Sequence, residues 1–310
     1  MRKICIKKNY FFLGTFSIIL TVFLLFSAFI LRTNVQYKSR ATGPNSGMKI
    51  VGGTSVTDPK KYPFYMFVTV NTQNGLKVCG GTLIDPQWVL TAYHCLYLDG
   101  AVKPATDVIV YTDALDLSLI KPHAVSSIVP YDTTTPKMVK HKETLLASQD
   151  IYFNDLVLLK LEEPLMNRDI AYLPTTTTVL TDSTVIIGVG NTWETAFEKI
   201  GPTDMNSLVL NEAEVTLVKP KGTFDPSVLY GGKVSDHYYY SSYTTKNTSV
   251  GSGDSGGPVL ELVDGKYYVI GVIATNSVGL GQPYGALYLK TAYYSHWMNY
   301  KMHPTSIKGR

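Results

Sequence analysis

From Ile50 onward, the hydrophobic residues fall into short runs that are rich in β-branched and aromatic side chains. Seven such runs predict strands, at 64–70, 107–113, 155–161, 183–190, 214–219, 267–275 and 285–290. Turn residues separate the runs, and a convincing amphipathic helical pattern occurs only at 291–302. Many short strands without alternating helices are typical of antiparallel barrels or sandwiches. The pattern therefore predicts an all-β protein with one α-helix near its C-terminus.

The N-terminus carries a different apolar pattern. Residues 10–31 contain no charged side chain over 22 positions and follow the basic leader 1–9. As a helix, this segment would be roughly 33 Å long, enough to cross a bilayer core of about 30 Å. It predicts a transmembrane signal-anchor with a cytoplasmic leader, or alternatively a signal peptide that is removed. In either case the remainder is exported, and it is membrane-anchored or secreted accordingly.

The remaining length divides at changes in composition. Residues 32–49 are polar and contain Gly, Pro and Ser, which is typical of a linker or propeptide. Residues 50–303 hold all the predicted strands and the helix, and 304–310 form a short tail. With 45% hydrophobic and 17% charged residues, the chain is of the globular class.

The net charge of +4 belongs to the N-terminal region. Eight of the 28 basic residues precede Asp58, the first acidic residue, so residues 50–310 hold 20 basic and 24 acidic residues and carry −4. This balance gives no basic face, and we expect no nucleic-acid partner.

The cysteine count limits the covalent chemistry. Cys5 lies in the leader, which leaves only Cys79 and Cys95 in the exported part. Two cysteines in an oxidising compartment can form one disulfide. No Cys/His cluster with zinc spacing occurs, so neither a metal nor a cofactor is expected.

The stretch GSGDSGGPV at 251–259 is the strongest candidate for chemistry. An ordinary surface turn is one interpretation, and the G-x-S-x-G nucleophile elbow of α/β-hydrolases is another. The elbow requires alternating strands and helices and a histidine after the acid. Only His296 and His303 follow Ser255, in or just past the terminal helical segment. The elbow interpretation therefore fails.

A serine hydroxyl becomes an effective nucleophile when a base takes its proton and a third group orients that base. The candidate base is His94 in TAYHC, since a Cys79–Cys95 bridge would close a loop that carries it. The candidate acid is Asp155, at the start of the apolar run NDLVLLKL. The chain order His94, Asp155, Ser255 is the order of the chymotrypsin class.

Five motifs in the same order carry a resemblance to the trypsin/chymotrypsin family of serine proteases. They are IVGG (50–53), CGGTLI (79–84), TAYHC (91–95), NDLVLLKL (154–161) and GDSGGP (253–258). The resemblance implies two antiparallel six-stranded β-barrels with a C-terminal α-helix, and a catalytic triad of His94, Asp155 and Ser255 in the cleft between the barrels. It also implies an oxyanion hole formed by the backbone N–H groups of Gly253 and Ser255.

The same resemblance implies activation by proteolysis. Cleavage of Lys49–Ile50 by a separate trypsin-like protease would release an Ile50 ammonium group that pairs with Asp254. Ser249 matches the floor of the family's specificity pocket, and Asn276 and Ala286 match its walls, which implies small or medium uncharged residues before the scissile bond.

Two positions depart from the family pattern. Gly251 stands where a pocket cysteine is frequent, and Ala274 stands where a serine usually hydrogen-bonds the catalytic aspartate, with Thr275 one step away. The expected function is an exported serine endopeptidase acting on protein or peptide substrates. The alternatives are a non-catalytic binding protein on the same scaffold and a membrane-tethered structural protein.

Overall fold

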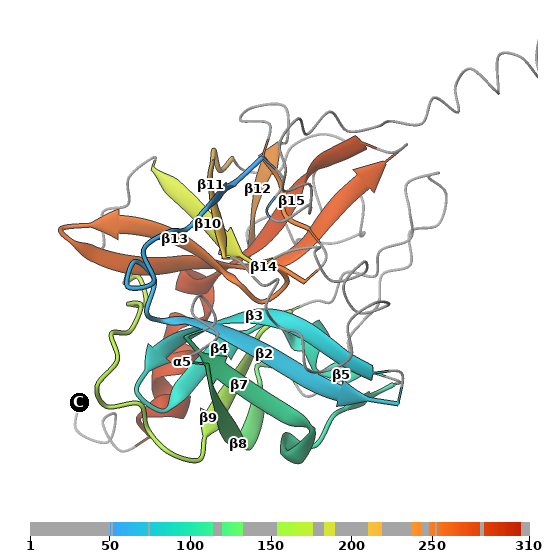
Figure 1. Cartoon of the computed structure of the whole chain (residues 1–310), viewed down its shortest axis with the longest axis vertical. Helices are drawn as coiled ribbons and strands as arrows, with labels where there is room; N and C mark the ends of the chain where they lie inside the picture. The colour runs from blue at the N-terminus through green and yellow to red at the C-terminus, as the bar shows by residue number, and fades with distance from the viewer. Residues whose placement is uncertain are drawn as a thin grey trace, which may run out of the picture. The chain divides into compact units, whose positions relative to one another are not determined.

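The computed structural model describes residue 50 and residues 52–73, 75–98, 100–113, 120–132, 154–175, 183–189, 210–218, 237–242, 248–251, 253–279 and 282–304. Within these ranges the chain is mostly β-strand, with two short 3₁₀ helices and one α-helix (Figure 1). The all-β prediction with a single C-terminal helix is confirmed.

Six strands of the N-terminal half form a closed antiparallel barrel. Their order is β2-β3-β4-β9-β8-β7, and their bounds are β2 (Tyr65–Thr72), β3 (Gly75–Asp85), β4 (Trp88–Thr91), β7 (Val108–Thr112), β8 (Lys121–Pro130) and β9 (Val157–Leu161). The excursion between β4 and β7 contains η1 (Tyr93–Cys95), β5 (Tyr97–Leu98), β6 (Ala101–Val102) and η2 (Ala105–Asp107). This barrel carries His94 on η1 and Asp155 just before β9.

The C-terminal half forms a second antiparallel sheet of order β1-β11-β10-β13-β14-β15-β12. The bounds are β1 (Thr54–Ser55), β10 (Thr184–Gly188), β11 (Asn211–Val215), β12 (Tyr238–Ser242), β13 (Pro258–Val263), β14 (Lys266–Gly279) and β15 (Gln282–Lys290). Val218, just after β11, exchanges two backbone hydrogen bonds with Tyr240 of β12, at 2.8 and 3.0 Å. This bridge brings the two sides of the sheet together, so β10 to β15 curve into the second barrel and β1 is an added strand.

Helix α5 (Thr291–Met302) covers the range expected from the sequence. It follows β15 of the second barrel and also contacts the first, because the Tyr294 hydroxyl donates to Asn154 Oδ1 at 2.9 Å. Tyr131, after β8, meets the rings of Tyr294 and Trp297 edge-on at 4.7 and 5.2 Å between centroids. The helix therefore ties the two barrels together.

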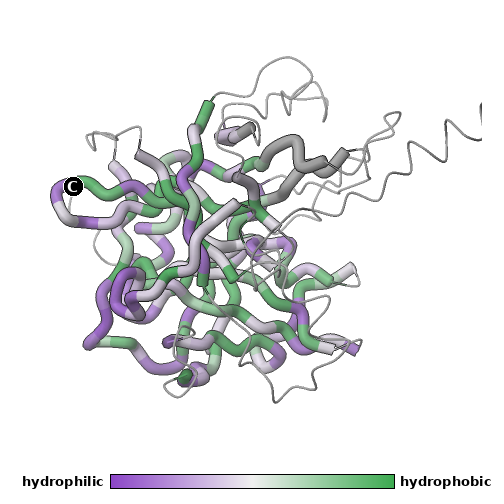
Figure 2. The backbone as a smooth tube through the Cα atoms, turned by 45° about the horizontal axis from the view of Figure 1, so that its top comes forward, coloured by the Kyte–Doolittle hydropathy of each residue, from purple (hydrophilic) through white to green (hydrophobic). Residues whose placement is uncertain are grey.

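Alternating burial explains why the sequence pattern misplaced β11. The run predicted at 214–219 overlaps only the end of β11, whose buried residues Asn211, Ala213 and Val215 alternate with Glu212 and Glu214. Because polar side chains occupy three of these five positions, the hydrophobic pattern placed the strand too late. Figure 2 shows short hydrophobic and hydrophilic segments following one another along the backbone.

The N-terminal predictions fall outside the described residues. The leader 1–9, the apolar segment 10–31 and the linker 32–49 all precede Ile50, the first described position. Among the residues that are described, no helix is both long and apolar enough to cross a membrane.

Candidate active site

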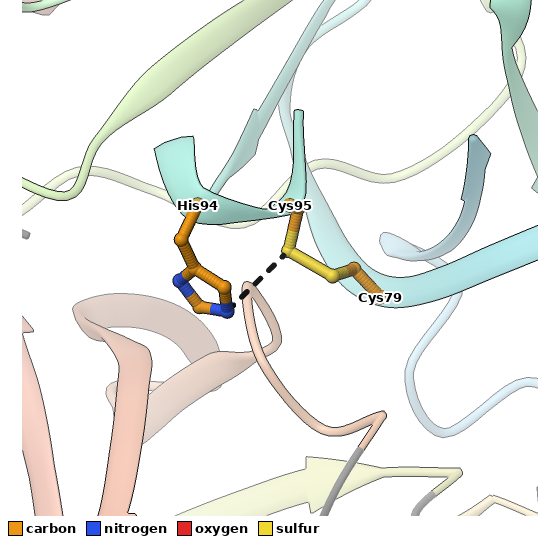
Figure 3. A group of neighbouring side chains, drawn as sticks. All are labelled: Cys79, His94 and Cys95. Atoms are coloured by element: carbon orange, nitrogen blue, oxygen red, sulfur yellow. Dashed lines mark hydrogen bonds between the residues drawn. A yellow bond between two sulfur atoms is a disulfide. The ribbon is translucent and has the colours of Figure 1, made fainter. Parts of the chain in front are cut away.

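A disulfide fixes the turn that carries His94. Cys79 on β3 and Cys95 at the end of η1 are bonded, with their Cα atoms 6.3 Å apart. Figure 3 shows the His94 ring beside this bridge, with Nε2 4.0 Å from the Cys95 sulfur. The two sulfurs and the imidazole are grouped like metal ligands. Because both sulfurs are bonded to each other, they are not available as thiolate ligands, and the group does not fit a metal site.

Asp155 holds His94 through two hydrogen bonds. Its Oδ2 lies 2.7 Å from the ring nitrogen Nδ1, and its Oδ1 accepts the backbone N–H of the same histidine at 2.7 Å. The carboxylate is buried, whereas 18% of the His94 side chain is exposed. A carboxylate on Nδ1 sets the tautomer with its proton there, which leaves Nε2, on the other edge of the ring, as the basic nitrogen.

The backbone of Ser255 lies against the same disulfide. Its carbonyl oxygen accepts the Gly80 N–H at 2.8 Å and is 3.8 Å from the Cys95 sulfur. Both Ser255 and His94 Nε2 are thus within 4.0 Å of one sulfur atom. Three residues predicted from distant parts of the chain are brought together where the two barrels meet.

Glycine is required in the turn around Ser255. Gly253 and Gly256 have φ angles of 91° and 80°, in the region that side chains rarely adopt. A β-carbon at Gly256 would lie 2.1 Å from Thr91 Oγ1 of the first barrel. Such contact leaves no room for a side chain, so the turn from the second barrel fits directly against the backbone of the first.

Asp254 is fully buried beneath this turn. One of its carboxylate oxygens, Oδ2, accepts the Gly251 N–H at 2.7 Å, and the other faces Gly188 of β10. Ile50 is also buried, in a cluster with Ile186 and Val250. Ile186 is two residues from Gly188 and Val250 is next to Gly251, so two members of this cluster are close in sequence to residues that contact Asp254.

The register of the second barrel aligns the predicted pocket walls. Asn276 of β14 and Ala286 of β15 are direct partners, and Ala286 is paired on its other side with Ser241 of β12. Ser249 is fully buried, and its hydroxyl has no hydrogen-bond partner in the part of the chain that the structure describes. Asn276 and Ala286 are therefore neighbours in the sheet, whereas the Asn276 side chain lies outside the described residues and the pocket assignment stays a prediction.

The departure at Ala274 has a structural basis. The β14–β15 register shifts between Ile273 and Thr275, so Ala274 is an extra, unpaired residue in a bulge. Its buried methyl group cannot donate a hydrogen bond. Within the described ranges, both hydrogen bonds to the Asp155 carboxylate come from His94.

The structure adds two groups next to His94 and Asp155 that sequence reasoning did not single out. Lys77 donates from Nζ to the carbonyl oxygen of His94 at 2.8 Å. Tyr294 of α5 donates from its hydroxyl to Oδ1 of Asn154, the residue before Asp155, at 2.9 Å. Alternation along β3 could have pointed to Lys77, because it lies two residues before Cys79 and shares its face. No local signal connects Tyr294 with Asn154.

The comparison with known families agrees with this geometry. Residues 50–298 match the family model described as Trypsin. The match begins at the buried Ile50, includes every residue of the site and ends inside α5. With its paired β-barrels, its buried aspartate–histidine pair and a match over more than half of its length, the chain belongs to the trypsin family of serine proteases.

Proposed function

We propose that the chain is an exported serine endopeptidase in which His94, Asp155 and Ser255 form the catalytic triad. The observation that carries the proposal is the double hydrogen bond from His94 to the buried Asp155, at 2.7 Å each. It presents Nε2 on the side where the Ser255 backbone meets the Cys95 sulfur. A histidine with only a structural role would not need one carboxylate to accept hydrogen bonds from both its ring and its backbone N–H.

The chemistry follows from these positions. Nε2 of His94 takes the proton of the Ser255 hydroxyl as its Oγ attacks the peptide carbonyl carbon, and Asp155 stabilises the resulting imidazolium. The imidazolium then gives its proton to the departing amine, which leaves an acyl group on Ser255. Water, activated by the same nitrogen, hydrolyses this ester and restores the serine.

The oxyanion of the tetrahedral intermediate is assigned to the backbone N–H groups of Gly253 and Ser255. The positive φ of Gly253 and the turn hydrogen bond from the Gly257 N–H to the Asp254 carbonyl, at 2.9 Å, favour a fixed orientation of this segment. One such donor typically contributes about 2.7–4 kcal/mol to the transition state.

We assign activation to cleavage of Lys49–Ile50. The burial of both Ile50 and Asp254 supports a pairing of the new ammonium group with the Asp254 carboxylate. A buried carboxylate without a cationic partner is costly, so the pairing would stabilise the turn that carries Gly253 and Ser255.

We assign the domain boundaries and the location of the catalytic domain from the sequence. The protease domain is assigned to 50–303, preceded by the leader 1–9, the anchor or signal peptide 10–31 and the propeptide 32–49. The catalytic domain then lies outside the cytoplasm, tethered by 10–31 or released.

A fluorophosphonate probe, which reacts with activated serines, tests the proposal. The chain cut after Lys49 should be labelled, and the label should be lost in Ser255→Ala. Ser295→Ala, which changes a partly exposed helix serine of α5, is the matched control and should keep the label. A folded, correctly cut chain that takes no label would support the non-catalytic binding protein instead.

A further inference from the structure

Lys77 contacts the catalytic turn from near the start of β3 in the first barrel. Along β3 its side chain shares a face with Cys79, because residues two apart point to the same side of a strand. Cys79 bonds to Cys95, and the Lys77 ammonium donates to the carbonyl oxygen of His94 at 2.8 Å. One face of β3 therefore holds two consecutive residues of η1.

The peptide groups on both sides of the His94 Cα have charged partners. Asp155 Oδ1 accepts the His94 N–H, and Lys77 donates to the His94 carbonyl. Hydrogen bonds with a charged member are shorter and stronger than neutral ones. The backbone of His94 is thus held from opposite sides, while Nδ1 is held by the second oxygen of Asp155.

Lys77 is partly buried, which is unfavourable for a charged group unless its charge has a role. Burial lowers the pKa of Lys77, and the Asp155 carboxylate partly opposes this effect. The ammonium therefore lies within the electrostatic field of the Asp155–His94 pair. Tyr294 of α5 also interacts with Asp155, but burial raises its pKa, so it stays neutral during turnover.

We propose that Lys77 is a positioning residue for the catalytic histidine: its ammonium fixes the His94 carbonyl and adds a positive charge beside the Asp155–His94 pair. This proposal rests on the triad proposed above. The Asp155 carboxylate attracts this charge, which helps to hold the lysine at the turn that carries His94.

Three variants separate the hydrogen bond from the charge. Lys77→Arg keeps both, Lys77→Gln keeps a donor without charge, and Lys77→Met keeps neither. We expect Lys77→Met to lower kcat about tenfold with KM nearly unchanged, since a base held less firmly affects the chemical step. Lys77→Arg should keep kcat near the wild-type value, and kcat of Lys77→Gln should fall between those of Lys77→Arg and Lys77→Met.

Lys160→Met is the matched control, because Lys160 is a partly buried lysine of β9 whose ammonium lies over the Trp88 ring at 5.7 Å. It should leave kcat and KM unchanged. Wild-type kinetics in Lys77→Met, or an equal loss in Lys77→Met and Lys160→Met, would overturn the proposal.

A second measurement does not depend on turnover. In the Ser255→Ala background, the proton shared by His94 Nδ1 and Asp155 can be followed by NMR with ¹⁵N-labelled histidine. Its resonance should shift or broaden with Lys77→Met and stay in place with Lys160→Met. An unchanged resonance refutes the role of Lys77 whether or not the enzyme is active, and absence of hydrolysis in the wild type refutes the proposed function alone.

Discussion

Gly188 leaves the space that the Asp254 carboxylate occupies. A β-carbon added to Gly188 would lie 2.1 Å from Asp254 Oδ1, a separation that real atoms do not adopt. Two buried tyrosines interact with this carboxylate. Burial, and then the Asp254 charge, raise the pKa of Tyr65. Burial and the Asp254 charge also raise the pKa of Tyr288, although its hydrogen bond with Ser241 lowers it. The absence of one side chain on β10 therefore allows the carboxylate to be buried.

Gly188→Ala should expel the Asp254 carboxylate from this position. Because Asp254 precedes the nucleophile directly, we expect the oxyanion site to be lost and kcat/KM to fall by about 100-fold or more. Gly271→Ala is the control in the same sheet, where the added carbon would meet the Leu289 carbonyl oxygen at 3.2 Å. Both variants are compared by peptide hydrolysis and thermal unfolding. Near-normal turnover in Gly188→Ala would contradict this role of the glycine.

The triad assignment predicts non-additive losses. His94→Ala and Ser255→Ala should each remove most of the turnover, and the double variant should be little worse, because the residues act as a unit. Single-turnover rates of the three proteins measure this directly. Strictly multiplicative losses would show that the two residues do not share one mechanism.

The Cys79–Cys95 disulfide should matter for stability and for the histidine. Replacing both cysteines by alanine is expected to lower the free energy of unfolding by about 2–4 kcal/mol, a typical disulfide contribution. Turnover should fall as well, because η1 loses one of its ties to β3. Mass spectrometry of the exported protein checks the bridge itself, and two free thiols would refute it.

Acid should weaken the attachment of the first strand. Glu212, opposite Thr54 in the β1–β11 pair, accepts from Lys61 Nζ and the Tyr62 hydroxyl. Burial tends to raise the pKa of Glu212, but these hydrogen bonds outweigh it and hold the pKa below its usual 4.5.

Ionised Glu212 therefore stabilises the fold above pH 4.5, and this contribution disappears as the pH falls through the lower pKa of the folded state. Because the pair is partly exposed, the effect at neutral pH should be below about 1 kcal/mol. Unfolding followed from about pH 6 to pH 3 should show a steeper loss in the wild type than in Glu212→Gln. Parallel stability curves for the wild type and Glu212→Gln would argue against a stabilising role of ionised Glu212.

The specificity pocket should not accept Lys49, the residue before the proposed activation cleavage. The buried Ser249 hydroxyl provides no carboxylate for a basic side chain, and a lysine buried there without a partner would be strongly disfavoured. We expect a peptide library to show preference for small or medium uncharged residues before the cut. Purified precursor should stay inert on standing and gain activity, with Ile50 as its new N-terminus, after brief trypsin treatment. Spontaneous cleavage after Lys49, or preference for Lys and Arg peptides, would contradict the pocket assignment.

Much of this protein was determined by the sequence alone. Short β-branched runs located β2, β7, β9, β10, β14 and β15, and the helical pattern gave the range of α5. The triad candidates, the disulfide and the buried aspartate followed from motifs whose residues are contiguous in the chain. Such features depend on local backbone preference and on covalent order, which a single sequence displays.

Tertiary structure alone decided the contacts between segments far apart in the chain. The extra residue at Ala274 depends on the register of β14 against β15, the fit of Asp254 depends on Gly188, and the hold on His94 depends on Lys77. A bulge, a missing side chain and an ammonium-to-carbonyl bond leave no periodic signal. They arise because close packing brings particular atoms within van der Waals or hydrogen-bond distance only when both barrels are complete.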